Sequence, residues 1–293
     1  MANQDVQKTL NELIRNTEML AALCALLSEL AGGAAPHPAA GLKFRAVRDA
    51  LDPNLFAGIT KDEAEFMLSL TIARLRRSME IIENPDQFPA WTTDDPVIMQ
   101  TQGKASRIAT RLITEFAQKE ASLSQLLSAP NRFLDVGSGA GWISLSMAEQ
   151  WPKLHTDGLE IHPPALELAK KNAFDVGLSD RVVFHNRSVD KLEVKNEYAA
   201  AFIPFIFVPE LILHSAIPAL ATALKVGAWL FIACYRKPES PVDIALWDLQ
   251  TTMSGGRVWD ENEITRLVGS SGFGPILDLG VGTPINMYAT RRL

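Results

Sequence analysis

The sequence predicts an α/β fold, in which a doubly wound, mostly parallel sheet of seven strands is preceded by an all-helical domain. In roughly the first 125 positions, apolar residues recur at helical spacing and no strong strand pattern interrupts them. From Asn131 onward, strand-like and helical segments alternate. Alternation implies parallel strands, because such strands need long crossover connections. We therefore expect a helical domain over residues 1–125 and an α/β domain over residues 126–293.

The helical region contains several recognisable start and stop signals. GGAAPHPAAG (32–41) interrupts the first helical pattern, and Thr60 with Glu63 forms a capping box that opens a helix through about Ile82. Three prolines then mark a loop that carries Trp91, and a further helix includes RIATRLITEFAQ. The apolar residues of the first pattern are Leu10, Leu13, Ile14, Met19, Leu20 and Leu27.

Seven strands are expected after Asn131, and helical patterns separate most of them. The last two are separated only by GVGTP, so we expect them to pair as a hairpin. The expected strands are RFLDVG, HTDGLEI, RVVFHN, AAAFIPF, WLFIACY, PILDLG and INMYATR.

Composition argues against several classes of function. The net charge of −6 disfavours a broad grip on nucleic acid, which usually requires a basic patch. Two cysteines in different halves of the chain argue against a disulfide framework or a four-ligand zinc site, and we expect no bound metal. The first residues lack the layout of a signal peptide, and no apolar run approaches the about 20 residues that span a bilayer. We expect a cytoplasmic protein without a membrane or nucleic-acid partner.

The stretch FLDVGSGAGWISLSMAEQ (133–150) carries the strongest local signal. Gly137, Gly139 and Gly141 are spaced G-x-G-x-G, and Trp142 occupies the place of the third glycine in the dinucleotide fingerprint. A bulky indole there conflicts with the close helix–strand packing that this glycine permits. No Gly-Lys-Ser/Thr follows, and the stretch holds no Arg or Lys for a phosphate. These residues disfavour an NAD-dependent oxidoreductase and a phosphate-binding loop of the Walker type.

With its loop LDVGSGAG, this stretch resembles the first motif of class I S-adenosylmethionine-dependent methyltransferases, which have a Rossmann-like fold. Glu160 ends the second expected strand and resembles the family's acid that hydrogen-bonds both ribose hydroxyls, since two carboxylate oxygens suit two vicinal hydroxyls. The resemblance extends over residues 131–293. There, LQTTMSGGRVWDENEITRLVGSSGF resembles the helix, Gly-Gly turn, helix and Gly-Phe of small-molecule O-methyltransferases with an added helical domain.

The resemblance implies S-adenosylmethionine as the cofactor and a set of residues around it. In that family the glycines let the backbone approach the methionine part of the cofactor. RVVFHNRSVDKL (181–192) is similar to the segment beside the adenine, with Ser188 in the place of the usual carboxylate. His162 is expected to cap the following helix. The residues expected to bind the cofactor are Asp135, Gly137, Ser138, Gly139, Gly141, Trp142, Glu160, Ile161, Ser188, Val189 and Pro204.

The general base is harder to place. Plant-type relatives use a histidine soon after the fourth strand, and here Pro209 falls at that position. Glu210 and His214 are the nearest titratable residues, and their spacing of four puts them on one face of a helix. They are the candidate catalytic residues. The alternative is a helix-start acid that the helix dipole favours, together with a surface histidine.

We expect the methyl acceptor to bind over the carboxyl ends of the strands, as ligands do in open α/β sheets. Trp91, Phe205, Phe207, Trp247 and Met253 are the candidates for its walls, with a place in the hydrophobic core as the alternative for each. They favour an apolar or aromatic small molecule that is methylated on oxygen, and leave nitrogen, carbon and sulfur acceptors open. The competing hypothesis is a catalytically inactive methyltransferase fold that serves as a binding or assembly module.

The helical region is expected to cover this site and to mediate self-association. Packing over the strand ends would shield the reacting groups from water. Leftover apolar faces, such as Leu10 through Leu27, would be buried against a second copy, since most soluble oligomers are symmetric. We therefore expect a homodimer formed through the N-terminal helices.

Overall fold

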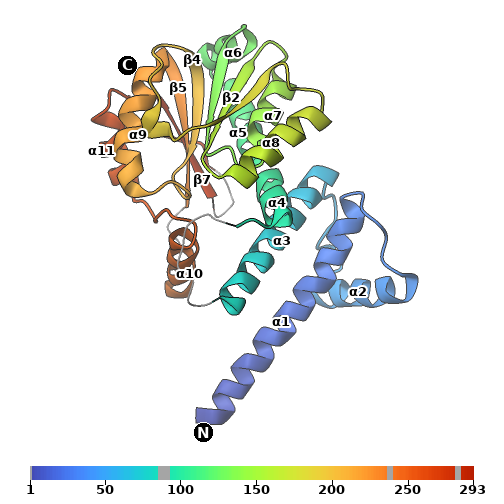
Figure 1. Ribbon diagram of the computed structural model, residues 1–293. Coiled ribbons are helices and arrows are strands. Elements are labelled where there is room, and N and C mark those ends of the chain that lie inside the picture. Colours follow the sequence, from blue (N-terminus) through green and yellow to red (C-terminus); the bar gives the residue numbers. More distant parts are fainter. Residues whose placement is uncertain (1, 85–92, 236–239, 281–284) are drawn as a thin grey trace. The chain divides into compact units, whose positions relative to one another are not determined.

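The computed structural model describes residues 2–84, 93–235, 240–280 and 285–293 (Figure 1). Packing divides the chain into two compact units, Met1–Met79 and Glu80–Leu293. This division falls earlier in the chain than the predicted boundary between residues 125 and 126, and the predicted domain assignment stays a prediction.

The first unit consists of α1 (Ala2–Leu30), α2 (Pro38–Leu51) and most of α3 (Lys61–Glu83). The expected capping box opens α3, because the Glu63 amide donates to Thr60 Oγ1 at 3.3 Å and the Thr60 amide donates to Glu63 Oε2 at 2.9 Å. The two halves of α1 differ in burial. Leu26 and Leu27 are buried, whereas four residues nearer the N-terminus are more than half exposed: Val6, Leu10, Leu13 and Ile14.

The second unit contains the sheet and the remaining helices. Its strands are β1 (Arg132–Val136), β2 (His155–Glu160), β3 (Val182–Asn186), β4 (Tyr198–Pro204), β5 (Leu224–Tyr235), β6 (Leu277–Asp278) and β7 (Ile285–Arg291). Its helices are α4 (Pro96–Ser106), α5 (Ile108–Ala117), α6 (Ala121–Ser128), α7 (Trp142–Gln150), α8 (Pro163–Asp175), α9 (Glu210–Ala223), α10 (Pro241–Thr252) and α11 (Glu261–Gly269), with a short 3₁₀ turn at Val189–Lys191.

The strands form one seven-stranded sheet in the order β3-β2-β1-β4-β5-β7-β6. The first five strands are parallel, and β7 pairs antiparallel with both β5 and β6. This arrangement confirms the predicted doubly wound, mostly parallel sheet and its terminal hairpin. The carboxyl ends of β1, β2 and β4 lie at one edge of the sheet because these strands run in the same direction.

Helices cover both faces of the sheet (Figure 1). On one face, α5, α6 and α7 pack against Phe133 and Phe231, and α8 packs against Phe184 of β3. On the other face, α9 and α11 pack against Leu134 and Ile203. Every residue of β4 is buried, as expected for a parallel strand covered on both sides.

Within the described ranges, the structure contains no helix with both the length and the apolar character that crossing a membrane requires.

Candidate active site

The loop between β1 and α7 depends on glycine for its path. Gly137, Gly139 and Gly141 have φ values of +64°, +53° and +84°, a region that side chains disfavour and glycine adopts freely. The loop is tied to β2, because the Ser138 amide donates to the Leu159 carbonyl at 3.0 Å. The sequence thus directs the chain sharply from the end of a buried strand into a helix.

The three glycines differ in what surrounds them. A Cβ atom on Gly141 would lie 2.5 Å from the ring of Phe184, so this position also lacks a side chain for packing reasons. A Cβ on Gly137 would make an ordinary 3.6 Å contact with Pro204. A Cβ on Gly139 would meet no protein atom within 4 Å. Gly139 therefore borders open space, where a ligand can approach the backbone.

Glu160, at the end of β2, lies against this loop. Its Oε2 accepts a hydrogen bond from the Gly139 amide at 2.8 Å, and its Oε1 accepts one from the His162 amide at 2.8 Å. The residue is 6% exposed. Each carboxylate oxygen has a second lone pair, so both can still accept a hydrogen bond from a ligand hydroxyl.

Asp135, on β1, is a buried carboxyl with unused hydrogen-bonding capacity. Its Oδ2 accepts from the Ser144 amide at 3.1 Å and from Ser144 Oγ at 2.7 Å. Its Oδ1 is buried and has no partner among the described residues, and the same holds for Ser138 Oγ in the loop. Burial raises the pKa of Asp135 to about 7, the hydrogen bonds from Ser144 oppose this shift, and the charge of Glu160 adds to it. The site therefore contains two buried polar atoms, Asp135 Oδ1 and Ser138 Oγ, that can form hydrogen bonds to a ligand.

The segment after β3 carries a further carboxylate, that of Asp190, for which the sequence predicted no role. Ser188 Oγ donates to Asp190 Oδ1, and this hydrogen bond lowers the pKa of Asp190. The Ser-x-Asp spacing, typical of local side-chain turns, is the signal that could have pointed to Asp190. Val189 is buried in the core, whereas Ile161 beside Glu160 is 64% exposed. The cofactor contacts predicted for Ser188, Val189 and Ile161 stay predictions.

His162 does not cap α8 with its side chain, contrary to expectation. Its Nε2 instead lies 3.1 Å from the Thr93 carbonyl oxygen and 3.2 Å from Asp94 Oδ1. Pro163 and Pro164 at the start of α8 have no N–H to donate, and the ring lies against the segment before α4 instead. Trp91 lies outside the described residues.

Trp142 begins α7, and its indole lies against α4. Its Nε1 donates to Gln100 Oε1 at 2.7 Å, and a Cβ on Gly103 would lie 2.7 Å from its ring. The space that a fingerprint glycine would leave empty is thus filled by an indole that reaches a neighbouring helix. A cofactor contact by Trp142 stays a prediction.

The residues predicted for the acceptor site fall into two groups. Phe205 is fully buried and packs edge-on against Trp259, at 5.3 Å between ring centroids, so it belongs to the core. Phe207, Trp247 and Met253 are half-buried, and Trp247 packs on Tyr235 at the end of β5 with centroids 4.2 Å apart. The second group lies nearer the surface and can offer apolar side chains to a ligand.

The predicted Gly-Gly turn is packed against the loop after β4. A Cβ on Gly256 would lie 2.5 Å from the Ile206 carbonyl oxygen, and Gly255 has a φ of +84°. The turn therefore brings the end of α10, including Met253, to the carboxyl end of β4.

The two candidate catalytic residues lie close together, and one of them, Glu210, is also bound by an arginine. His214 Nε2 lies 3.9 Å from Glu210 Oε1, and His214 is 60% exposed. Glu210 Oε1 also accepts from Arg257 at 2.9 Å. Arg257 donates as well to Glu263 at 2.9 Å and lies over the Trp259 ring, 3.7 Å from its centroid. Because a guanidinium holds its carboxylate, this arrangement favours the interpretation of Glu210 as a helix-start acid.

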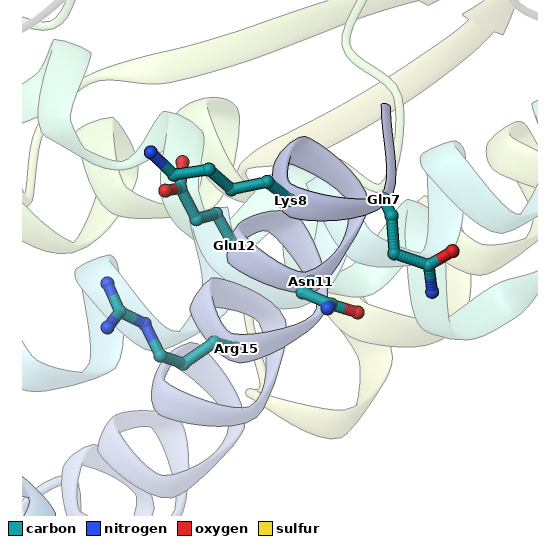
Figure 2. Close-up of a pocket in the computed structure, with 5 residues that line it drawn as sticks. All are labelled: Gln7, Lys8, Asn11, Glu12 and Arg15. Atoms are coloured by element: carbon teal, nitrogen blue, oxygen red, sulfur yellow. The ribbon is translucent and has the colours of Figure 1, made fainter. Parts of the chain in front are cut away.

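A separate surface hollow lies on α1 in the first unit (Figure 2). The side chains that line it come from this single helix and are all polar: Gln7, Lys8, Asn11, Glu12 and Arg15. A hollow lined by one helix alone encloses no ligand, so it is not a candidate for the acceptor site. In the described part of the chain, no group of three or more His, Cys, Asp or Glu residues could hold a metal ion.

Residues 133–227 match a family described as "Methyltransferase domain". Among curated proteins, the chain is similar to tRNA1(Val) (adenine(37)-N6)-methyltransferase of Porphyromonas gingivalis, with 43% identity over 56 residues. It is also similar to release factor glutamine methyltransferase of Chlorobaculum tepidum, with 34% identity over 79 residues. These matches cover 19% and 27% of this chain, and 22% and 27% of the two relatives. The chain therefore matches only about a quarter of their length.

Solved structures extend the likeness to the whole fold. An O-methyltransferase family protein from Burkholderia thailandensis has a TM-score of 0.65 at 14% identity, covering 100% of this chain and 98% of that one. Mitomycin 7-O-methyltransferase gives 0.55 at 17% identity, covering 100% and 99%. Human N-acetylserotonin methyltransferase gives 0.60 at 12% identity, covering 100% and 98%. At such identities the likeness concerns the fold alone.

Proposed function

We propose that this chain, which carries a class I S-adenosylmethionine-dependent methyltransferase domain, transfers a methyl group from S-adenosylmethionine to a small apolar or aromatic molecule, most readily to oxygen. The observation that carries the proposal is the loop at Gly139, which is open to a ligand and lies within hydrogen-bonding distance of Glu160.

The residues around this loop suit the chemical groups of the cofactor. S-adenosylmethionine presents a cationic ammonium group, a ribose diol and an adenine amine. Asp135 Oδ1 and Ser138 Oγ are buried polar atoms without a partner, and Asp135 offers the negative charge that an ammonium group requires. Glu160 retains acceptor capacity for the diol, and the Ser188–Asp190 pair offers acceptors for an amine. The fit therefore supports the proposed cofactor.

When bound, the cofactor supplies an electrophilic methyl group on a sulfonium. The protein then has to hold an acceptor atom in line with that methyl group and exclude water, and such orientation can lower a barrier by about 7–11 kcal/mol. Glu210 and His214 stay the candidate base, although the hydrogen bond from Arg257 to Glu210 favours a structural role for Glu210. We infer that the chain acts best on acceptors whose hydroxyl ionises easily, such as phenols and enols.

The acceptor is proposed to bind at the carboxyl ends of β4 and β5. Phe207, Trp247 and Met253 would contribute apolar surface there, and Trp91 is proposed to add to it. Two of the similar structures are named for acting on mitomycin and N-acetylserotonin, which supports an organic small-molecule acceptor. The net charge of −6 and the short matched stretches disfavour the RNA and protein acceptors that the curated relatives are named for.

The N-terminal helices are proposed to form a homodimer and to cover the acceptor site. The exposed residues Val6, Leu10 and Leu13 follow one another at spacings of four and three, the pattern of a helix seam. Lys8, Glu12 and Arg15, drawn in Figure 2, lie on the opposite face of α1 and leave the seam apolar. The chain is proposed to act in the cytoplasm.

A second candidate function rests on the same Arg257–Glu210 contact. Because it occupies the nearest carboxylate, the chain could be a binding or assembly module that holds the cofactor without turnover. Turnover with any acceptor would exclude this alternative.

The test is a calorimetric titration with S-adenosylhomocysteine and, separately, with NADH. It is followed by a methyl-transfer screen of phenols, amines and carboxylic acids. We expect S-adenosylhomocysteine alone to bind and a phenol to be methylated. Binding of NADH alone would overturn the proposal, and cofactor binding without any methyl transfer would favour the inactive module.

A further inference from the structure

Two side-chain amides, on α4 and α8, pair with each other beside the glycine loop. Gln100 Nε2 donates to Asn172 Oδ1 at 2.7 Å, and Asn172 Nδ2 donates back to Gln100 Oε1 at 3.3 Å. Asn172 is 6% exposed. A buried amide without partners is costly, so this reciprocal pairing fixes the two helices relative to each other.

The pair also holds the glycine loop at two points. Asn172 Nδ2 donates to the Ala140 carbonyl at 2.8 Å, and Trp142 Nε1 donates to Gln100 Oε1 at 2.7 Å. Ala140 follows Gly139 directly, and Trp142 is the first residue of α7. The two contacts therefore fix the end of the loop, immediately after the glycine that borders open space.

Gly103 shows that the approach of α4 to this loop is close. A glycine inside a helix costs about 1 kcal/mol relative to alanine, so its presence in α4 calls for a reason. A Cβ there would lie 2.7 Å from the Trp142 ring and 3.1 Å from the Ala140 Cβ. The amide pair hydrogen-bonds to Ala140 and Trp142, and the missing side chain of Gly103 leaves room for these same two residues.

We propose that Gln100 and Asn172 are positioning residues for the cofactor, and that they couple cofactor binding to the ordering of α4. This inference rests on the proposed function. The amide pair keeps the loop in its ligand-ready path, so less conformational freedom is lost when the cofactor binds. By reciprocity, a bound cofactor that fixes the loop must stabilise α4 in its docked position.

The first test measures the affinity for S-adenosylhomocysteine in a double-mutant cycle of Q100L and N172L. Each single variant leaves a buried polar group unpaired, so we expect about 5- to 100-fold weaker binding at unchanged stoichiometry. The double variant should lose much less than the product of the two single losses. A swapped pair, Q100N with N172Q, keeps one amide on each helix and should recover most of the affinity.

G103A provides a variant that removes no hydrogen bond. It should weaken binding by displacing Trp142 and Ala140, although alanine favours the helix itself. T101A is the matched control on the same helix, because the Thr101 hydroxyl donates to backbone carbonyls of α4 itself, at 2.7 Å from Val97 O and 3.2 Å from Ile98 O. It should bind as the unmodified chain does.

The second test reads the coupling itself by hydrogen exchange. S-adenosylhomocysteine should slow exchange across residues 96–106 in the unmodified chain, and this protection should be lost in Q100L. Unchanged affinity in Q100L and N172L would overturn the inference, and so would protection of α4 that persists in Q100L at saturating ligand. If the unmodified chain bound no S-adenosylhomocysteine, the proposed function would fail as well.

Discussion

Glu160 ends β2, and Glu210 begins α9, the helix that follows β4. The structure holds these two glutamates by different means. Glu160 is 6% exposed and accepts hydrogen bonds from two backbone amides, those of Gly139 and His162. The side chain of Glu210 is 46% exposed and is bound by the side chain of Arg257. Backbone amides of a fixed loop cannot move away, whereas a long guanidinium side chain can change its rotamer.

The surroundings of Glu160 are therefore rigid, whereas those of Glu210 can rearrange. Around Glu160 the polar groups are fixed, and Asp135 Oδ1 has no partner among the described residues, so a ligand can bind without rearrangement. Around Glu210 a single guanidinium, that of Arg257, is shared between two carboxylates, and Phe205 and Trp259 are buried nearby. On the proposed assignment of the two sites, the cofactor side is preorganised, whereas the acceptor side would have to open or shift to admit a molecule.

The largest effect is expected from G139V. A branched side chain would fill the open space beside the loop and disfavour the φ of +53°, so S-adenosylhomocysteine affinity should fall roughly 100-fold or more, about 2.7 kcal/mol. Isothermal titration measures this loss, and circular dichroism checks that the chain is folded.

G177V is the matched control for this substitution. Gly177 has a φ of +70° and also meets no atom within 4 Å, but it lies in the turn after α8. The control should show the backbone strain as a lower melting temperature and keep its affinity. Equal affinities in the two variants would remove the loop from the cofactor site.

The next effect compares E160Q with E210Q. The amide at residue 160 replaces an acceptor oxygen by a donor, so cofactor affinity should fall by roughly 1.5–3 kcal/mol, the range for hydrogen bonds to charged groups. E210Q changes a side chain that touches Arg257 instead, so its affinity should stay unchanged. Calorimetry on both variants gives the answer, and similar losses in the two would erase the contrast between the sites.

A pH dependence is expected from Asp135. Its pKa is raised from 3.8 to about 7, so between these values the folded chain keeps a proton that the unfolded chain releases. The free energy of unfolding should therefore fall as pH rises through this window. In D135N, which cannot ionise, this contribution is absent. Urea titrations from pH 5 to 8 measure both slopes.

The same carboxyl should make cofactor binding pH-dependent. An ammonium group favours ionised Asp135, so the affinity for S-adenosylhomocysteine should rise by up to about tenfold per pH unit below pH 7 and level off above it. D135N should bind weakly at every pH. A flat profile in the unmodified chain would place the ammonium group elsewhere.

The smallest effect is expected from E210Q on methyl transfer. If Glu210 only fastens α9 to Arg257, the variant should lose little activity, and stability should fall by about 0.2–1 kcal/mol, the range for exposed ion pairs. A general base would contribute about 10²–10⁴-fold. Rates with the best acceptor from the screen decide between the two roles, with H214Q measured in parallel.

The fold was predictable because its signals are local. Buried strands, glycine loops and the capping box at Thr60 and Glu63 depend on residues close together in sequence, and the structure confirms the sheet and its terminal hairpin. The position of Glu160 at the end of the second strand was predictable in the same way, whereas its hydrogen bond from the Gly139 amide was not predicted.

The remainder depended on contacts between distant segments. Nothing local to Glu210 indicates that Arg257 will bind it, and nothing local to His162 indicates that its ring will meet Thr93. Trp142 is the clearest case. The sequence shows that Trp142 cannot pack as the fingerprint glycine does. The direction of its indole, however, depends on Gly103 of α4, which is separated from α7 by α5, α6 and β1.

Gly103 and Trp142 have a consequence for the history of this family of sequences. The glycine accommodates the indole and the indole fills the space that the glycine leaves, so a change at one position is unfavourable while the other stays. Natural substitutions should therefore occur in pairs, with a small residue in place of Trp142 wherever a larger one replaces Gly103. Because both residues have to change together, such substitutions should be rare. The two positions should covary although they lie on different helices.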